Sequence, residues 1–238
     1  MIPKKIHYCW FGRGEMPQMA LDCIASWHKY MPDWEYKLWN EDNFDVGYCQ
    51  YSKEAYDAGK YAFVSDVARL VAIEKEGGIY LDVDFEIYKS FEPLLQYKAF
   101  AGFEGCKRKL VMMGAFGSEP HGKWVNEILH MYDGRHFIKE DGTFDLTTNV
   151  LAATMLMERS GFVRNWKEQD YKDLHVFPTD YFSPKHTTGE YFRTENTYCE
   201  HKGVSSWADR KDGMKILAKI VGSKNMTRLI KLKRKILG

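Results

Sequence analysis

The chain has 238 residues, of which 45% are apolar and 28% charged, and its formal net charge is +1. These values suit one large domain with a sizeable core better than two small domains. No run of apolar residues approaches the length needed to span a membrane, and the N-terminus lacks the apolar core of a signal peptide. Five scattered cysteines form no CxxC pair, which argues against a zinc or dithiol redox site and favours a cytosolic protein.

The first forty residues predict the start of an α/β sandwich. Residues 2–12 read as a short apolar strand that runs into a glycine-containing loop. Residues 19–32 form an amphipathic pattern that predicts a helix stopped at Pro32, and residues 34–40 predict a second strand. This strand, helix, strand order is typical of a domain built on a largely parallel sheet.

The middle of the chain carries the clearest pattern. Residues 65–78 predict a helix that Ser65 caps and that ends at Gly77 or Gly78. Residues 79–88 then alternate strictly between apolar and polar side chains, which predicts one strand. Its polar face would carry Tyr80, Asp82, Asp84, Glu86 and Tyr88.

Further elements are predicted beyond residue 100. Strands are expected at 109–117 and 174–178, and helices at 121–132 and 147–161. The last thirty residues predict one or two basic helices broken near residues 222–223. Residues 103–145 and the loop through His186 carry no recognisable motif.

The acidic pair at Asp82 and Asp84 suggests a metal site. Two positions apart on a strand, the side chains leave one face with Cα atoms roughly 6.5–7 Å apart, so both can reach one hard cation. Oxygen ligands favour Mn²⁺ or Mg²⁺ over zinc, and such an ion would neutralise a departing diphosphate. The alternative is that both acids merely belong to the solvated face of a half-buried strand.

Three separated segments resemble one family. KYAFVSDVARL followed by EKEGGIYLDVDFE is similar to the DXD region of capsular polysaccharide sugar transferases, Och1-like mannosyltransferases and, distantly, the large clostridial glucosylating toxins. IPKKIHYCWFG resembles the family's first strand, and NTYCEHKGVSSW its closing segment. The resemblance implies a GT-A type nucleotide-diphospho-sugar transferase fold, a single Rossmann-like α/β domain with a mixed central sheet over residues 1–208.

The resemblance also implies roles for individual residues. Catalysis would rest on Asp66, Arg69, Asp82 and Asp84, with Asp84 binding the ion more directly than Asp82. The expected donor-binding residues are Trp10, Ser65, Asp66, Arg69, Tyr80, Asp82, Asn149, Ser206 and Trp207. The expected metal ligands are Asp82, Asp84 and His201, the last of which would complete the shell or bond a phosphate oxygen.

Plainer readings exist for several of these residues. Asp66 and Arg69 lie three apart on a helix and would otherwise be an ordinary ion pair. A Trp at a strand end, such as Trp10, is more often core than a base-stacking platform. A lone His, such as His201, is more often structural than a ligand.

The function expected from the resemblance is that of a retaining, metal-dependent hexosyltransferase. It would move a hexose from a nucleotide-sugar donor, with a UDP-sugar favoured over GDP-mannose, to a glycan or lipid-linked glycan acceptor in surface polysaccharide or lipopolysaccharide synthesis. No residue stands out as a covalent nucleophile, so a front-face displacement is expected. The alternatives are a nucleotide-sugar hydrolase and a non-catalytic sugar-binding module.

Charge is divided unevenly along the chain. Residues 211–238 hold nine Lys or Arg and one acid, so this segment carries +8 while residues 1–210 carry −7. Apolar residues recur among these basic ones at near-helical spacing, which predicts a basic amphipathic tail over 209–238 that docks on the inner leaflet. Packing on the acidic body is the alternative, and no nucleic-acid partner is expected.

Overall fold

The computed structural model describes residues 1–104, 108–184 and 192–203. Met1–Lys202 form one compact unit. Ser206, Trp207 and the basic tail lie outside the described residues, so the predicted division at residue 208 stays a prediction.

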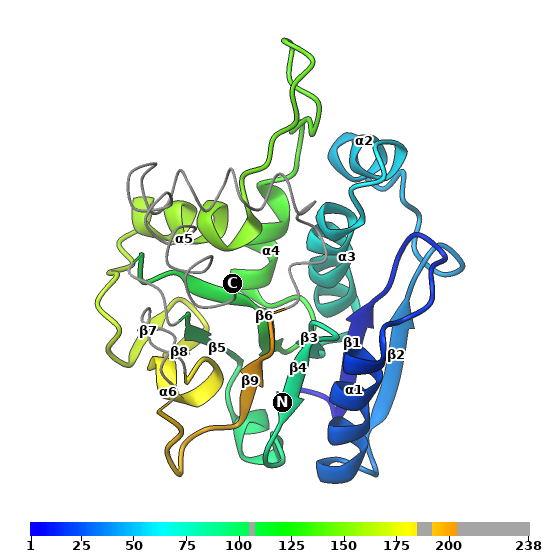
Figure 1. Ribbon diagram of the computed structural model, residues 1–238. Helices are drawn as coiled ribbons and strands as arrows, with labels where there is room; N and C mark the ends of the chain where they lie inside the picture. Colours follow the sequence, from blue (N-terminus) through cyan, green and yellow to red (C-terminus); the bar gives the residue numbers. More distant parts are fainter. Residues whose placement is uncertain (105–107, 185–191, 204–238) are drawn as a thin grey trace, which may run out of the picture. The chain divides into compact units, whose positions relative to one another are not determined.

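Within the described residues, seven strands form one mixed sheet in the order β2-β1-β3-β6-β5-β8-β7 (Figure 1). β1 pairs in parallel with β2 and β3, and β5 pairs in parallel with β8. β6 pairs antiparallel with both β3 and β5, and β7 pairs antiparallel with β8. The mixed sheet expected from the resemblance is therefore confirmed, whereas a largely parallel sheet is not. The strands are β1 Lys5–Cys9, β2 Glu35–Trp39, β3 Gly78–Leu81, β5 Ala99–Phe103, β6 Val111–Ser118, β7 Gln169–Tyr171 and β8 Leu174–Phe177.

Helices cover both faces of this sheet, as Figure 1 shows. One hydrophobic cluster joins α2, α3, α4 and α5 to the sheet, and a second joins α1, the 3₁₀ helix η1 and α6 to it. Because strand side chains alternate, β6 supplies Met113 to the first cluster and Met112 to the second. The helices are α1 Gln18–Tyr30, α2 Gln50–Asp57, α3 Tyr61–Glu76, η1 Glu92–Gln96, α4 Lys123–His130, α5 Asn149–Arg159 and α6 Thr179–Phe182.

Most predicted elements are confirmed, but the start of α3 is not where the sequence suggested. The helix begins at Tyr61, so Ser65 is inside it and does not cap it. The Ser65 hydroxyl instead donates to the Tyr61 carbonyl at 3.2 Å, one turn back. The predicted end is correct, because the helix is capped by Gly77, whose φ of +63° favours glycine.

The single strand predicted over residues 79–88 is two strands. β3 ends at Leu81 and β4, Phe85–Ile87, belongs to a separate two-stranded sheet with β9, Cys199–His201. Between them the chain turns, since the Phe85 N–H donates to the Asp82 carbonyl at 3.1 Å. Asp82 and Asp84 therefore lie on a turn and not on one face of a strand.

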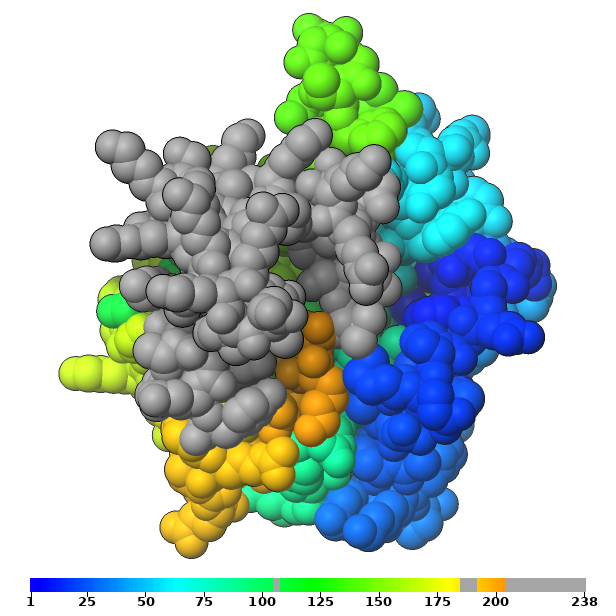
Figure 2. Space-filling model, in the orientation of Figure 1, coloured from blue at the N-terminus to red at the C-terminus, as the bar shows by residue number. Residues whose placement is uncertain are grey.

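The tip of the connection from α4 to α5 projects beyond the helices and the sheet, which Figure 1 and Figure 2 both show in green, whereas Phe137 in the same connection is buried in the core. An isolated bridge between Ile138 and Phe144 closes it. In the described part of the chain, no helix is both long and apolar enough to cross a membrane.

Candidate active site

The predicted residues gather where parallel strands end. Trp10 directly follows β1 and Asp82 directly follows β3, and these two strands are parallel neighbours. The carboxyl edge of such strands is where ligands bind in open α/β sheets. Trp10 is half-buried, and its indole N–H donates to the Gly14 carbonyl at 2.6 Å.

Arg69 of α3 lies at the centre of the site. Its guanidinium is buried, with one nitrogen donating to the Met113 carbonyl of β6 at 2.7 Å. Another nitrogen is 3.0 Å from an Asp66 carboxylate oxygen and 3.3 Å from one of Asp82. The guanidinium also lies over the Tyr80 ring at 4.6 Å. This buried arrangement is different from the ordinary surface ion pair considered for Asp66 and Arg69.

Asp66 is held at the start of another helix. It is buried, and burial raises its pKa to about 6 although the positive charge of Arg69 opposes that shift. The backbone N–H of Asn149, the first residue of α5, also bonds the carboxylate. The Asn149 side chain is buried, and its Nδ2 has no hydrogen-bond partner among the described residues. A buried amide without a partner is the kind of group that a bound hydroxyl can satisfy.

Asp82 is positioned by its neighbours on both sides. The Tyr80 hydroxyl donates to one carboxylate oxygen at 2.7 Å, and Arg69 approaches both oxygens at 3.3 and 3.4 Å. Gly114 of β6 allows the close approach of this side chain, because a Cβ there would lie 2.6 Å from Asp82 Oδ2. One third of the Asp82 side chain remains exposed, so it can also contact a ligand.

Asp84 and His201 meet across the β4–β9 pair. His201 Nε2 lies 2.9 Å from Asp84 Oδ2, and the His201 ring stacks on Phe85 at 4.9 Å. Burial lowers the pKa of His201, but the hydrogen bond to Asp84 and the nearby negative charges outweigh burial and raise it above its usual value. These charges belong to Asp84, Asp82 and Glu104.

Asp84 and His201 would be able to hold a divalent ion only in place of the hydrogen bond between them, because a histidine ligand must be unprotonated. Neighbouring ligands of an octahedral ion with bonds of about 2.1 Å lie about 3 Å apart, close to the observed separation of the Asp84 oxygen and the His201 nitrogen. Among residues 1–104, 108–184 and 192–203, no three His, Cys, Asp or Glu side chains are arranged to hold an ion by themselves. An ion at this position would therefore need diphosphate oxygens and water to complete its shell, as is usual at phosphate sites.

The structure thus brings together most of the predicted residues. Ser65 contributes its carbonyl to Arg69 Nε at 3.1 Å, and its hydroxyl donates to the Tyr61 carbonyl within α3. Its role in donor binding stays a prediction. Nothing can be said of Ser206 and Trp207, which fall outside the described residues.

Sequence reasoning missed Glu104, which follows β5. Burial raises the pKa of Glu104 to about 7, and the negative charge of Asp82 adds to this while His201 opposes it. A partly buried carboxyl with a near-neutral pKa is typical of functional sites. Its only sequence signal is an acid after an apolar run at the end of a strand, which is common to many surface positions.

Fold and site together define the class of protein. The arrangement is the GT-A type fold, and residues 82–84 form an acidic turn at the carboxyl edge of the sheet. The solved structure of PaToxG glycosyltransferase has the same fold, with a TM-score of 0.50 and 16% identity over 67% of this chain and 70% of that chain.

Residues 17–101 match the family model described as "Glycosyltransferase sugar-binding region containing DXD motif". Over this segment the chain is similar to the DXD-containing glycosyltransferase family, in agreement with the resemblance drawn from its motifs. Asp66, Arg69, Asp82 and Asp84 all lie in the matched segment, whereas Trp10, Asn149 and His201 lie outside it.

Two relatives show how far the likeness extends. The chain is 34% identical over 103 residues to inositol phosphoceramide mannosyltransferase 3 of Schizosaccharomyces pombe, covering 42% of this chain. That match spans only 29% of the mannosyltransferase. The chain is 25% identical over 225 residues to an uncharacterised glycosyltransferase of Acanthamoeba polyphaga mimivirus, covering 87% of this chain and 84% of the relative.

Proposed function

We propose that this protein is a metal-assisted hexosyltransferase that uses a nucleoside-diphosphate sugar and retains the anomeric configuration. The observation that carries the proposal is the buried Arg69, which ties Asp66 and Asp82 together beside the Asp84–His201 pair. A cation and fixed positive charge next to each other suit the stabilisation of a departing diphosphate. The family match adds the sugar-binding region.

Each side chain has a distinct task in this proposal. Trp10 stacks on the donor base, and Asp66 and Asn149 bond sugar hydroxyls. Asp84 and His201 hold Mn²⁺ or Mg²⁺, and the ion supplies charge neutralisation to the diphosphate. Arg69 keeps the carboxylates in place and adds positive charge, so positioning and electrostatics provide most of the rate enhancement.

UDP is the favoured nucleotide of the donor, and a surface or lipid-linked glycan is the favoured acceptor. GDP-mannose is the second choice, and the likeness to a mannosyltransferase keeps it in consideration. A few side chains set the choice of sugar, so the fold does not determine it.

A transfer assay with a panel of nucleotide sugars and Mn²⁺ tests the proposal. We expect one UDP-hexose to be consumed faster when a glycan acceptor is present, and Asp84→Asn to lower kcat/KM on the order of 100-fold or more. Asp57→Asn, which removes an exposed partner of Lys53, is the control and should leave the rate unchanged. Release of free sugar at a rate that no acceptor changes would favour a hydrolase instead.

A further inference from the structure

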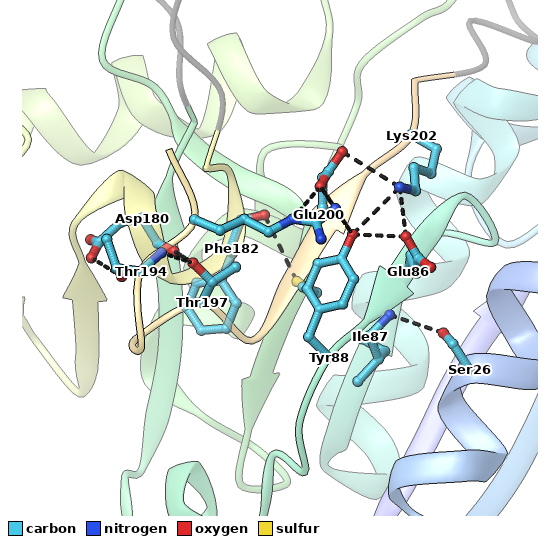
Figure 3. Close-up of polar contacts among 12 residues, drawn as sticks. Ser26, Glu86, Ile87, Tyr88, Asp180, Phe182, Thr194, Thr197, Glu200 and Lys202 are labelled. Carbon is cyan, nitrogen blue, oxygen red and sulfur yellow. Dashed lines mark hydrogen bonds and ion pairs between the residues drawn. The ribbon is translucent and has the colours of Figure 1, made fainter. Parts of the chain in front are cut away.

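A group of charged and polar side chains lies on the two-stranded sheet that carries His201. We call β4 and β9 together the β4–β9 ribbon. The β4–β9 charge cluster comprises Glu86, Tyr88, Arg193, Glu200 and Lys202. Figure 3 shows the Tyr88 hydroxyl between Glu86 and Glu200, at 2.7 and 3.0 Å.

The ribbon needs side-chain support because its backbone pairing is short. Phe85, Glu86 and Ile87 pair with His201, Glu200 and Cys199. One further backbone hydrogen bond lies at each end, from the Tyr88 N–H to Tyr198 and from the Lys202 N–H to Asp84. An isolated two-stranded ribbon is marginally stable. The Glu86–Glu200 pair also places like charges directly across the strands, which is destabilising unless other groups compensate.

The cluster supplies this compensation. Glu200 is only 2% exposed, and Arg193 donates to its carboxylate through Nε at 3.0 Å and through a second nitrogen. Lys202 Nζ lies 2.5 Å from Glu86 and 3.6 Å from Glu200. The carboxylates of Glu86 and Glu200 are therefore balanced by the side-chain charges of Arg193 and Lys202. Burial and the hydrogen bonds to both carboxylates raise the pKa of Tyr88, so its hydroxyl keeps its proton.

The other edge of the ribbon is already fixed. The Trp27 indole N–H of α1 donates to the Phe85 carbonyl at 2.7 Å, and the Ile87 N–H donates to the Ser26 hydroxyl at 2.9 Å. β4 is thus attached to α1 independently of β9. Cys199 of β9 is buried in the hydrophobic cluster that also holds Phe85 and Ile87. The β4–β9 charge cluster adds side-chain contacts between β9 and β4.

We propose that Glu200, bonded by Tyr88 and Arg193, is a positioning residue that keeps β9 in the register in which His201 faces Asp84. A slip of one residue would exchange the faces of Glu200 and His201. The buried Glu200 carboxylate would then leave Arg193, and His201 would leave both Asp84 and Phe85. This inference rests on the proposed function, in which His201 is a ligand of the ion.

Nuclear magnetic resonance on the full chain without nucleotide tests the positioning directly. Glu200→Gln keeps the shape of the side chain and removes its charge. We expect the Overhauser contact between the stacked rings of Phe85 and His201 to weaken several-fold in this variant. Tyr88→Phe, which removes only the hydroxyl, should weaken it in the same direction and serves if Glu200→Gln does not fold.

Two controls separate positioning from general loss of stability. Glu195→Gln changes an exposed acid on the same segment and should leave the ring contact intact. Val176→Ala removes buried volume from β8 and should lower the Tm while leaving the contact intact. An undiminished contact in both Glu200→Gln and Tyr88→Phe would overturn the inference.

Binding of Mn²⁺ with UDP to the same variants tests the consequence for the site. We expect the affinity to fall about tenfold in Glu200→Gln, in the range seen when groups that orient metal ligands are removed. The two outcomes are separable. If Glu200→Gln loses the contact between the Phe85 and His201 rings, the positioning role of Glu200 is upheld. If the wild-type protein binds no nucleotide, the proposed function is contradicted whatever the ring contact shows.

Discussion

At the scale of single residues, one arginine organises the site. Arg69 bonds the carbonyls of Ser65 and Met113 and contacts the carboxylates of Asp66 and Asp82. A guanidinium offers five donors in a rigid plane, whereas a lysine offers one compact charge. The side chain therefore joins α3, β6 and the acidic turn in a way that a lysine cannot.

Gly114 provides a prediction at the same scale. A Cβ at this position would lie 2.6 Å from Asp82 Oδ2 and 2.8 Å from the Phe85 ring. Tyr80 and Arg69 hold Asp82, so the carboxylate cannot simply move aside. We expect Gly114→Ala to cost roughly 1–3 kcal/mol of stability and to lower kcat/KM about tenfold or more.

Chemical denaturation and steady-state kinetics measure these two effects. The control is Gly14→Ala, because a Cβ on Gly14 meets nothing within 4 Å and its backbone carbonyl is retained. Wild-type kcat/KM in Gly114→Ala would show that the close approach of β6 to Asp82 is unimportant.

Asp66, Arg69, Asp82 and Asp84 could be named as candidates from the family resemblance, because they stand in a recognisable order along the chain. Gly114 and Glu104 could not be predicted. Gly114 lies on β6 and Glu104 directly follows β5, and each is significant only because the fold brings it near Asp82. A single glycine or acid has no pattern of its own in the sequence. Ser65 is of a residue type that commonly caps helices, but it lies inside α3 because the helix begins one turn earlier, at Tyr61.

At the scale of elements, the acidic turn shows where pattern reasoning reaches its limit. Strict alternation over residues 79–88 is equally compatible with one strand or with two short strands around a turn. The structure has the turn, with β3 and β4 in different sheets. This turn places Asp84 near β9. β9 has three residues, which are too few to show the alternation of apolar and polar side chains that predicts a strand.

His7 links three elements and gives a prediction on pH. Its Nε2–H donates to the Gly77 carbonyl at 2.9 Å, and its Nδ1 accepts from the Trp39 indole at 2.9 Å. Only the neutral ring satisfies both partners. Burial accordingly lowers the pKa of His7 to about 4.

The unfolded chain therefore binds a proton at this residue that the folded chain excludes between about pH 6.5 and pH 4. The contribution of neutral His7 to stability is full above pH 6.5 and is lost as the pH falls through this window. We expect the difference in unfolding free energy between wild type and His7→Gln to shrink by up to about 1.4 kcal/mol per pH unit.

Denaturant titrations at pH 7.0, 5.5 and 4.5 measure this difference. His121→Gln, at an exposed histidine, serves as the control. A wild-type advantage over His7→Gln that is the same at all three pH values would contradict the neutral, buried assignment.

At the scale of the whole molecule, the opposite charges of residues 1–210 and 211–238 invite a test of membrane docking. We expect the full chain to float with phosphatidylserine vesicles and to be released by salt, since each basic residue near an anionic surface contributes about 1 kcal/mol. A chain ending at Asp209 should not float. Equal and negligible binding by both proteins would contradict an inner-leaflet site.

In the proposed function, Asp84 and a divalent ion hold a nucleoside diphosphate at the carboxyl edge of the sheet. Thermal shift of the purified chain against UDP, GDP and other nucleoside diphosphates, with and without Mn²⁺, tests it most directly, because a ligand that binds the folded state raises Tm. We predict a rise with UDP that requires Mn²⁺ and disappears in Asp84→Asn. No rise with any nucleotide, or an equal rise in Asp84→Asn, would contradict the metal-bridged donor site.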